Sequence, residues 1–206
     1  MVCRATPLRS TALSVASAHK LRFGQDIILY NLELIDQVED FDGQAHKDAW
    51  ANDPIWQGVR ENVEKLTAIR DWAEAFFAAT IVFEPLVGGL FRSEFIMQVA
   101  ALQGDFVTPT LMGAGESDTA RDLRVARRLF GMLSADEQHG EANRATMQSW
   151  LETWTPVSLA AARTLQPIWS QPGEKVIRFE ESLDHSRRRF QEVLADLNLD
   201  AKELDR

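Results

Sequence analysis

Cysteine is almost absent from this sequence, which has one, Cys3, in 206 residues. One cysteine cannot form an intramolecular disulfide or supply a cysteine-based metal site. Proteins without disulfides are typical of a reducing compartment. The N-terminal stretch 1–24 lacks the apolar block of a signal peptide, and no window approaches the roughly 20 apolar residues of a membrane-spanning helix. We therefore expect a soluble cytoplasmic protein with no membrane partner.

Positive charge is also scarce, because 22 Lys and Arg stand against 31 Asp and Glu, for a net charge of −9. A nucleic-acid-binding domain is expected to show a basic patch or stripe, so the composition argues against a nucleic-acid partner. Two basic clusters, Arg127-Arg128 and Arg187–Arg189, lie inside helical patterns flanked by acids. We interpret both clusters as solvated or partner-facing helix faces.

Strand signals are missing as well, since no alternating Val/Ile/Thr run bounded by Asn-Gly or Asp-Gly occurs. Apolar residues recur at helical spacing instead. The sequence predicts an all-α bundle of six to eight helices in one domain, 1–206, with a polar tail at 201–206. The expected helices cover residues 10–38, 54–70, 71–102, 117–133, 134–154, 155–169 and 174–197.

Prolines mark several expected helix features. Asp53-Pro54 is typical of an N-cap followed by proline at the first helical position. Pro85 falls inside a long apolar segment and predicts a bend near residues 81–85, because proline removes a backbone hydrogen bond. Thr155-Pro156 predicts the start of a new helix.

Two segments between these helices are predicted to be irregular. The stretch 39–52 is polar and is expected to be a linker, and 103–117 is expected to be a loop because of its Gly and Pro content. Ser134, with Glu137 three residues later, matches a capping box and predicts that a helix begins there.

Histidine is rare, and its scarcity bears on metal binding. A carboxylate-bridged di-iron site in a helical bundle needs one Glu from each of two helices and a Glu-x-x-His motif from each of two others. The chain has four histidines. Only His139 follows a carboxylate by three residues, and that carboxylate is Asp136. The other interpretation of His139 is a histidine hydrogen-bonded to a neighbouring carboxylate or backbone group at a helix start.

Glu84 is the carboxylate that stands out, because it lies in a long apolar segment. The residue three positions later is Val87, which cannot bind iron. At most one of the two required motifs is therefore present, and we predict no metal site and no catalytic residue in this chain. A buried carboxylate is costly unless it is paired. We expect either a structural partner for Glu84, from the set Arg92, Arg121 and Arg124, or a functional role.

Four stretches together resemble a known family. They are "DWAEAFFAATIVFEPLVGGLFRSEF", "GDFVTPT", "DEQHGEANRATMQSWLETWTP" and "ARTLQPIWSQP". They resemble the small (β) subunit of the hydroxylase of soluble bacterial multicomponent di-iron monooxygenases. The propane/alkene branch is the most similar, and the methane, phenol and toluene enzymes are its relatives. The resemblance covers about residues 18–200 with the motifs in the same order.

This resemblance implies a ferritin-like bundle without a di-iron site. In the family, the related large (α) subunit carries both Glu-x-x-His motifs and the chemistry. Glu84–Val87 and Asp136–His139 then look like degenerate remnants of those motifs. The expected function is that of a non-catalytic structural subunit, which holds the di-iron α subunit that oxidises a small hydrocarbon with O2 and NADH-derived electrons.

The resemblance also implies partners. They are the α subunit and a second copy of this chain, in an α2β2-type assembly, with a reductase and a coupling protein acting on it. Tryptophan is enriched at binding hot spots, so some of the tryptophans are interface candidates, with core packing as the alternative for each. The candidates are Trp50, Trp56, Trp150, Trp154 and Trp169.

In one respect the chain departs from the family. Members usually carry a long N-terminal extension and an opening helix, whereas this chain begins near the family's second main helix. We therefore expect an N-terminally short member, with part of the domain missing. Two other functions remain open. One is an independent di-iron oxidase, in which Glu33, Glu84, Asp136 and His139 would converge. The other is a helical scaffold unrelated to oxygenases.

Overall fold

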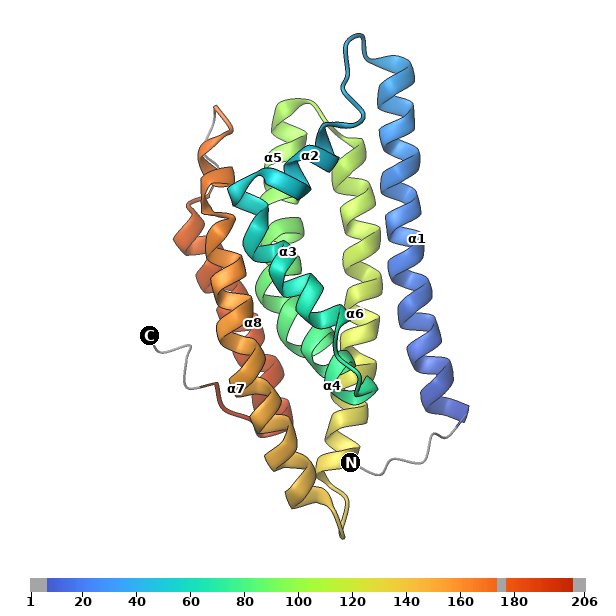
Figure 1. Cartoon of the computed structure of the whole chain (residues 1–206), viewed down its shortest axis with the longest axis vertical. Helices are drawn as coiled ribbons and strands as arrows, with labels where there is room; N and C mark the ends of the chain where they lie inside the picture. Colours follow the sequence, from blue (N-terminus) through green and yellow to red (C-terminus); the bar gives the residue numbers. More distant parts are fainter. Residues whose placement is uncertain (1–6, 174–176, 202–206) are drawn as a thin grey trace.

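The computed structural model describes residues 7–173 and 177–201 (Figure 1). Every regular element within these residues is helical, so the all-α prediction is confirmed. The elements are α1 (Pro7–Gln37), α2 (Ala45–Asn52), α3 (Pro54–Thr67), α4 (Trp72–Phe77), η1 (Ala78–Gly88), η2 (Leu90–Ile96), α5 (Met97–Val99), η3 (Ala100–Gln103), α6 (Val107–Ser134), α7 (Gly140–Thr164), η4 (Gln166–Ser170) and α8 (Phe179–Leu197).

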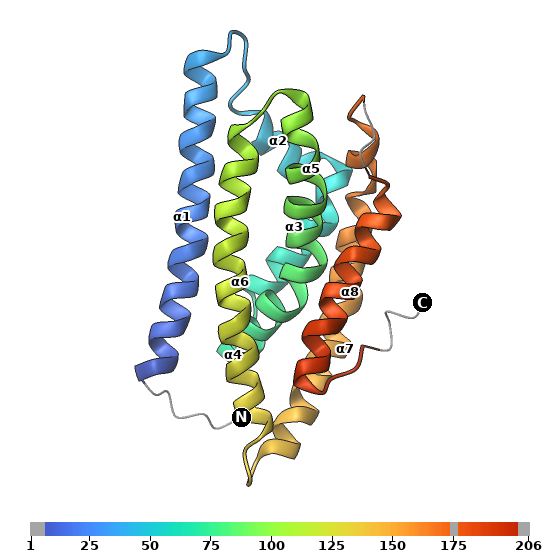
Figure 2. The same cartoon turned by 180° about the vertical axis from the view of Figure 1, so that it is seen from behind.

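The centre of the bundle is the helical segment 72–103, made of α4, η1, η2, α5 and η3. Its apolar side chains are buried among α3, α6, α7 and α8. Figures 1 and 2 show the arrangement of these helices from opposite sides. Phe77 and Phe130 meet edge to face there, with ring centroids 5.2 Å apart. α1 lies outside this core and packs along α6.

The central segment is long and apolar enough to cross a membrane by length and composition, so the expectation that no window approaches a membrane-spanning helix is wrong. However, 67% of its most apolar window is buried inside the structure. Burial of this kind is what a core helix of a soluble protein shows.

Of the proline predictions, the one at Pro54 is confirmed and the one at Pro156 is wrong, whereas the bend at Pro85 stays a prediction. Asp53 caps α3 as predicted, because its carboxylate accepts a hydrogen bond from the Ile55 N–H. Pro85 lies inside the π-helix η1, which runs from Ala78 to Gly88. The predicted break at Pro156 is wrong, because α7 continues through it. Thr155 beside it is fully buried, so tertiary packing overrides the local signal.

Two segments predicted to be irregular are also largely helical. The expected linker 39–52 contains α2. The expected loop 103–117 is mostly helix, because α6 begins at Val107, and the Asp105 carboxylate accepts hydrogen bonds from the Val107 and Thr108 N–H groups. Gly115 in this helix allows a close approach, since a Cβ there would lie 2.7 Å from the Phe23 ring of α1.

The expected capping box is replaced by a turn. Ser134 ends α6, and the Asp136 carboxylate accepts hydrogen bonds from the Gln138 and His139 N–H groups. The next helix begins at Gly140.

Some predictions fall on residues outside the described ranges. Cys3, the expected helix start at Glu174 and the tail from residue 202 onward are among them. Ala201, the first residue of the expected polar tail, is buried against the core.

Candidate functional site

Glu84 is the centre of a cluster of charged side chains in the bundle interior. It projects from η1 and is buried. The Arg92 guanidinium, eight residues later on η2, donates to one carboxylate oxygen at 2.5 Å. The Lys20 ammonium of α1 donates to the other oxygen. Arg92 also donates to Glu116 of α6 at 2.6 Å, so three helical layers are tied together at one point.

Both basic groups favour the charged form of Glu84. Burial alone would raise the pKa of this carboxyl group, but the charges of Arg92 and Lys20 outweigh burial and hold the pKa below its usual range. Burial likewise acts to lower the pKa of Arg92, and the nearby carboxylates of Glu84 and Glu116 raise it overall. The cluster is therefore an ion-pair network, in which the charge of Glu84 is compensated by protein cations.

A second buried carboxylate, Glu94, lies two residues beyond Arg92 on the same segment. It accepts a hydrogen bond from Arg189 at 2.6 Å and contacts the His185 ring nitrogen Nδ1 at 2.9 Å. Both partners come from α8. The Arg187–Arg189 cluster was expected to be a solvated or partner-facing face, and Arg189 departs from this in part, because it pairs with a buried acid although its side chain is 42% exposed.

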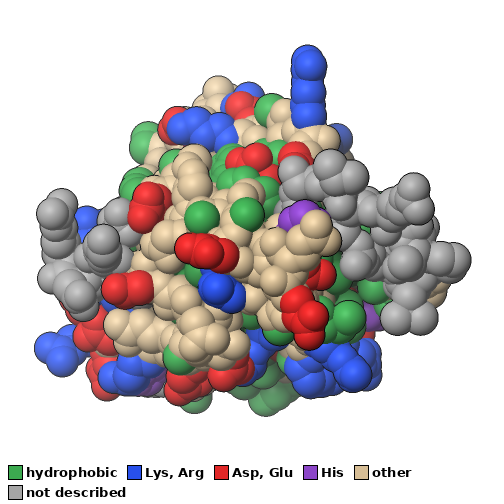
Figure 3. Space-filling view, turned by 90° about the horizontal axis from the view of Figure 1, so that it is seen from below, with side chains coloured by type: hydrophobic (Ala, Val, Ile, Leu, Met, Phe, Trp, Pro, Cys, Tyr) green, Lys and Arg blue, Asp and Glu red, His purple; other side chains and the backbone are tan. Residues whose placement is uncertain are grey.

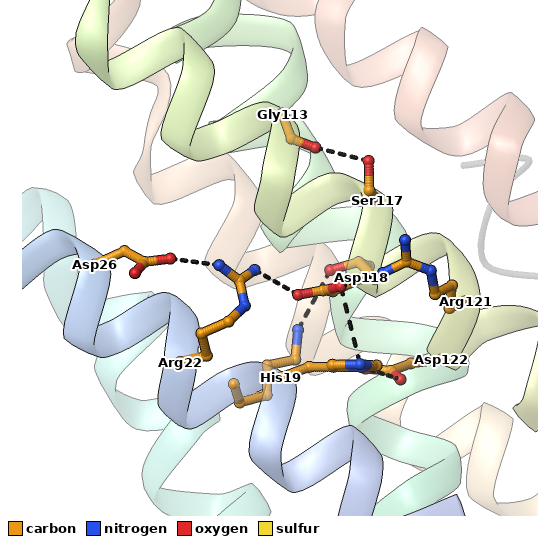
Figure 4. Close-up of polar contacts among 10 residues, drawn as sticks. His19, Arg22, Asp26, Gly113, Ser117, Asp118, Arg121 and Asp122 are labelled. Carbon is orange, nitrogen blue, oxygen red and sulfur yellow. Dashed lines mark hydrogen bonds and ion pairs between the residues drawn. The ribbon is translucent and has the colours of Figure 1, made fainter.

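A third group of charges joins α1 to α6 (Figure 4). The His19 ring lies between two carboxylates of α6, with Nδ1 2.8 Å from Asp122 and Nε2 3.9 Å from Asp118. Arg22 and Arg121 each contact Asp118 at 2.5 Å. Hydrogen bonding from Arg22 is the main reason that the pKa of Asp118 is lowered. Polar contacts thus join α1 to α6 beside the apolar contact of Phe23 at Gly115.

The other basic cluster lies at the surface. Arg127 of α6 pairs with Asp196 of α8. On the end of the bundle drawn in Figure 3, basic and acidic side chains are interspersed with apolar ones.

The residues named from the sequence are only partly brought together. Of the three arginines expected to pair with Glu84, Arg92 does so, whereas Arg121 pairs with Asp118. Asp136 and His139 lie exposed in the turn between α6 and α7, so they do not share a helix face. Val87 is buried in the core.

The four residues required by the independent di-iron oxidase do not converge. Glu33 is exposed on α1, and Asp136 and His139 are exposed in their turn, whereas Glu84 is buried and paired with two cations. Within residues 7–173 and 177–201, no group of three or more His, Cys, Asp or Glu is arranged to hold a metal ion. An ammonium and a guanidinium already contact both oxygens of Glu84, so this donor set does not fit a di-iron centre.

The tryptophan candidates divide into core and surface. Trp154 and Trp169 are buried in this chain's own core, with Nε1 donating to Glu74 at 3.0 Å and to Ser182 at 3.1 Å, respectively. Trp56 and Trp150 are partly buried against the core. Trp50 is 38% exposed and stays an interface prediction.

Sequence reasoning missed Lys20 and Glu116 as partners in the cluster. Their signal was present but weak, because each is a charged residue three or four positions from an apolar one on a long helix. Many surface residues share that property. Only the register of α1 and α6 against η1 selects these two, and periodicity does not fix that register.

The lowered pKa of Glu84 predicts a specific acid sensitivity. A carboxyl group whose folded pKa lies below its unfolded value of 4.5 stabilises the fold above that value. This stability is lost as pH falls from the unfolded value through the lower, folded one. Urea unfolding measured from about pH 7 to about pH 3 should therefore show a shallower acid loss in Glu84→Gln than in the wild type. Identical acid limbs in the two proteins would contradict the prediction.

The bundle and its interior charges define a class of protein, a ferritin-like helical bundle whose central carboxylate is held by Lys and Arg. Residues 3–137 match the family described as Methane/Phenol/Alkene Hydroxylase. The small subunit of the hydroxylase component of propane 2-monooxygenase from Rhodococcus jostii (strain RHA1) is 53% identical over 97% of this chain and 55% of its own length. The chain therefore belongs to the methane/phenol/alkene hydroxylase family, and the resemblance to its propane branch is confirmed.

More distant relatives agree with this placement. The methane monooxygenase component A beta chain from Methylosinus trichosporium is 27% identical over 94% of this chain and 48% of its own length. A solved structure of toluene 4-monooxygenase, with toluene bound in its resting active site, superposes with a TM-score of 0.67 at 25% identity. The superposition covers 75% of this chain and 50% of the toluene 4-monooxygenase chain, and it confirms the predicted fold. The chain spans about half the length of the curated relatives it matches.

Proposed function

We propose that this chain is a non-catalytic structural subunit of the hydroxylase of a multicomponent, propane/alkene-type monooxygenase. The observation that carries the proposal is the pairing of Glu84 with Lys20 and Arg92. A bundle that used this carboxylate for iron would have to leave its oxygens free. The two basic side chains instead neutralise the charge of Glu84. This carboxylate therefore takes part in an ion-pair network that joins helices of the bundle.

In the proposed assembly, the large α subunit carries the di-iron centre and oxidises a small hydrocarbon with O2. A reductase would supply NADH-derived electrons, and a coupling protein would act on the same assembly in the cytoplasm. Two large and two small subunits would form an α2β2 hydroxylase. The family membership and the small-subunit relatives support this role, and they weigh against a helical scaffold unrelated to oxygenases.

Co-expression with the large hydroxylase subunit of the same monooxygenase system would test the role. We expect the two chains to purify together with iron, and this chain alone to bind no stoichiometric iron. Glu84→Gln in the complex should leave the iron content per large subunit unchanged, because the carboxylate does not act as a ligand. Its matched control is the corresponding Glu→Gln change in a large-subunit Glu-x-x-His motif, which should lower the iron content.

Two results would overturn the proposal. One is near-stoichiometric iron bound to this chain in isolation. The other is loss of iron from the complex on Glu84→Gln while the two subunits remain associated. The readouts are metal analysis and the mass of the complex, so neither depends on the hydrocarbon used as substrate.

A further inference from the structure

Charges of opposite sign lie on opposite faces of α6. The acids of this helix turn inward and are partnered by other helices, because Glu116, Asp118 and Asp122 contact Arg92, Arg22 and His19, respectively. The exposed charged side chains of α6 are instead all arginines, namely Arg121, Arg124 and Arg128. The whole chain has a net charge of −9, so an outward face that carries only positive charge departs from the rest of the molecule.

The exposed arginines lie on one stripe of α6 together with two apolar residues. Positions 121, 124, 125, 128 and 132 follow one another at helical spacing, and all five are exposed. Val125 is 41% exposed and Met132 is 62% exposed. The three arginines and Val125 line a shallow hollow of the surface with Arg127. At a rise of about 1.5 Å per residue, the stripe is about 16 Å long, or about three helical turns.

Two of these arginines have no carboxylate of their own chain as a partner. Arg121 pairs with Asp118, and in Figure 4 it lies on the opposite side of that carboxylate from Arg22. Arg124 and Arg128 form no ion pair within residues 7–173 and 177–201. They are four residues apart on one helix, so their like charges repel each other across one turn and weaken the helix slightly. A carboxylate supplied by another molecule would offset this repulsion.

The chemistry of the stripe favours a protein as its ligand. The guanidinium group of Arg matches the geometry of a carboxylate and can donate two parallel hydrogen bonds to it. Arg and Met are both enriched at protein interfaces. A nucleic acid fits less well, because a chain with a net charge of −9 repels a long polyanion. Inorganic phosphate has no apolar group to contact Val125 and Met132. The stripe therefore fits a segment that carries carboxylates and apolar side chains together.

We propose that the exposed stripe of α6, from Arg121 to Met132, docks an acidic amphipathic helix of a partner protein. Carboxylates of that helix pair with the three arginines, and its apolar side chains contact Val125 and Met132. A helix suits the stripe because acids spaced three, four and seven residues apart share one face. The stripe belongs to this chain alone, so the inference is independent of the scaffold role.

A synthetic helical peptide tests the docking. The probe is an amphipathic peptide of about four helical turns with Glu at spacings of three and four residues and Leu beside them. Its matched control has Gln in place of every Glu. Fluorescence anisotropy should show that the wild-type chain binds the Glu peptide at least about tenfold more tightly than the Gln peptide. Added salt should weaken this binding, because it screens exposed charges. Equal affinities, or no binding of the Glu peptide, would overturn the proposal.

Reversal of two charges locates the site on α6. Arg124→Glu/Arg128→Glu should weaken binding of the Glu peptide at least about tenfold. Arg163→Glu/Arg188→Glu is the matched control, because it makes the same change in net charge at exposed arginines of α7 and α8 and should leave the affinity unchanged. Equal losses in the two charge-reversed chains would overturn the proposal.

A rescue experiment separates loss of the site from loss of the fold. A peptide with Lys in place of every Glu should bind the Arg124→Glu/Arg128→Glu chain more tightly than it binds the wild type. A gain of affinity is not expected of a chain that fails to fold. Absence of this gain in a chain that circular dichroism shows to be helical would count against docking at the stripe.

Other occupants of the stripe give different results. Under the proposal, Met132→Ala weakens binding of the Glu peptide and leaves the affinity for heparin unchanged. Heparin that binds more tightly than the peptide, with neither ligand affected by Met132→Ala, would make the stripe a polyanion site and overturn the proposal. Light scattering tests for a second copy of the chain. Self-association of the wild type that Arg124→Glu/Arg128→Glu abolishes would identify a second copy as the occupant and would also overturn the proposal.

Discussion

Replacing Arg92 with Met is expected to lower the free energy of unfolding by about 3–5 kcal/mol. Arg92 is the residue that joins Glu84 to Glu116, and its side chain is largely buried. Met carries no charge, so the variant leaves the buried Glu84 and the partly buried Glu116 with Lys20 as the remaining cation. An uncompensated buried charge costs far more than the ion pair contributes in net terms.

Urea denaturation would measure this effect, with Lys65→Met as the control. Lys65 pairs with Glu61 one turn away on the exposed face of α3, and such pairs contribute about 0.3–0.5 kcal/mol. The double variant Glu84→Gln/Arg92→Met should recover part of the loss, because it removes a buried charge together with its partner. A cost below about 1 kcal/mol for Arg92→Met would mean that water or another cation compensates Glu84.

The helical architecture was largely readable from the sequence, because an apolar stripe at helical spacing has to be buried against another helix. Boundaries were less readable. Gly113 and Gly115 suggested a loop, but helix α6 runs through both, and Gly115 serves the approach of Phe23. Pro156 suggested a helix start, but it lies inside α7. In each case a residue with low helix propensity is tolerated, because tertiary packing offsets the free energy that it costs the helix.

The charge cluster was readable only in part. Glu84 was identified because a carboxylate in an apolar run needs a partner, and Arg92 was one of three partners considered. Lys20 was not found, since it lies 64 residues away on another helix. Local periodicity says which face of a helix is buried but not which residue of a neighbouring helix lies opposite. A long-range ion pair depends on which residue of the neighbouring helix lies opposite, so periodicity does not predict it.

The same limit explains the turn at Asp136 and His139. The spacing of the two residues matched half of a metal motif, but the motif works only if both lie on one helix. Asp136 instead uses its carboxylate to accept backbone hydrogen bonds between two helices. Asp is favoured in such turns for that reason. The shorter Asp in place of Glu was therefore a sign of turn chemistry.

Trp169→Ala is expected to destabilise this chain by about 3–5 kcal/mol even when no partner is present. The Trp169 side chain is 6% exposed, and its ring lies 4.7 Å from that of Phe95 and 5.1 Å from that of Phe179 between centroids. Its Nε1 donates to Ser182, so the substitution also leaves a buried hydroxyl group without its partner.

Trp50→Ala provides the comparison, because Trp50 is the interface candidate that remains exposed. Its removal should change the free energy of unfolding by about 0.5 kcal/mol or less, as is usual for surface positions. If Trp50 contacts the large subunit, the same change should weaken co-purification with that subunit, since a tryptophan at an interface is often a hot spot. Urea unfolding of the isolated chain and titration with the large subunit separate the two roles. A Trp50→Ala chain with unchanged affinity would remove Trp50 from the interface, and a stable Trp169→Ala chain would contradict its place in the core.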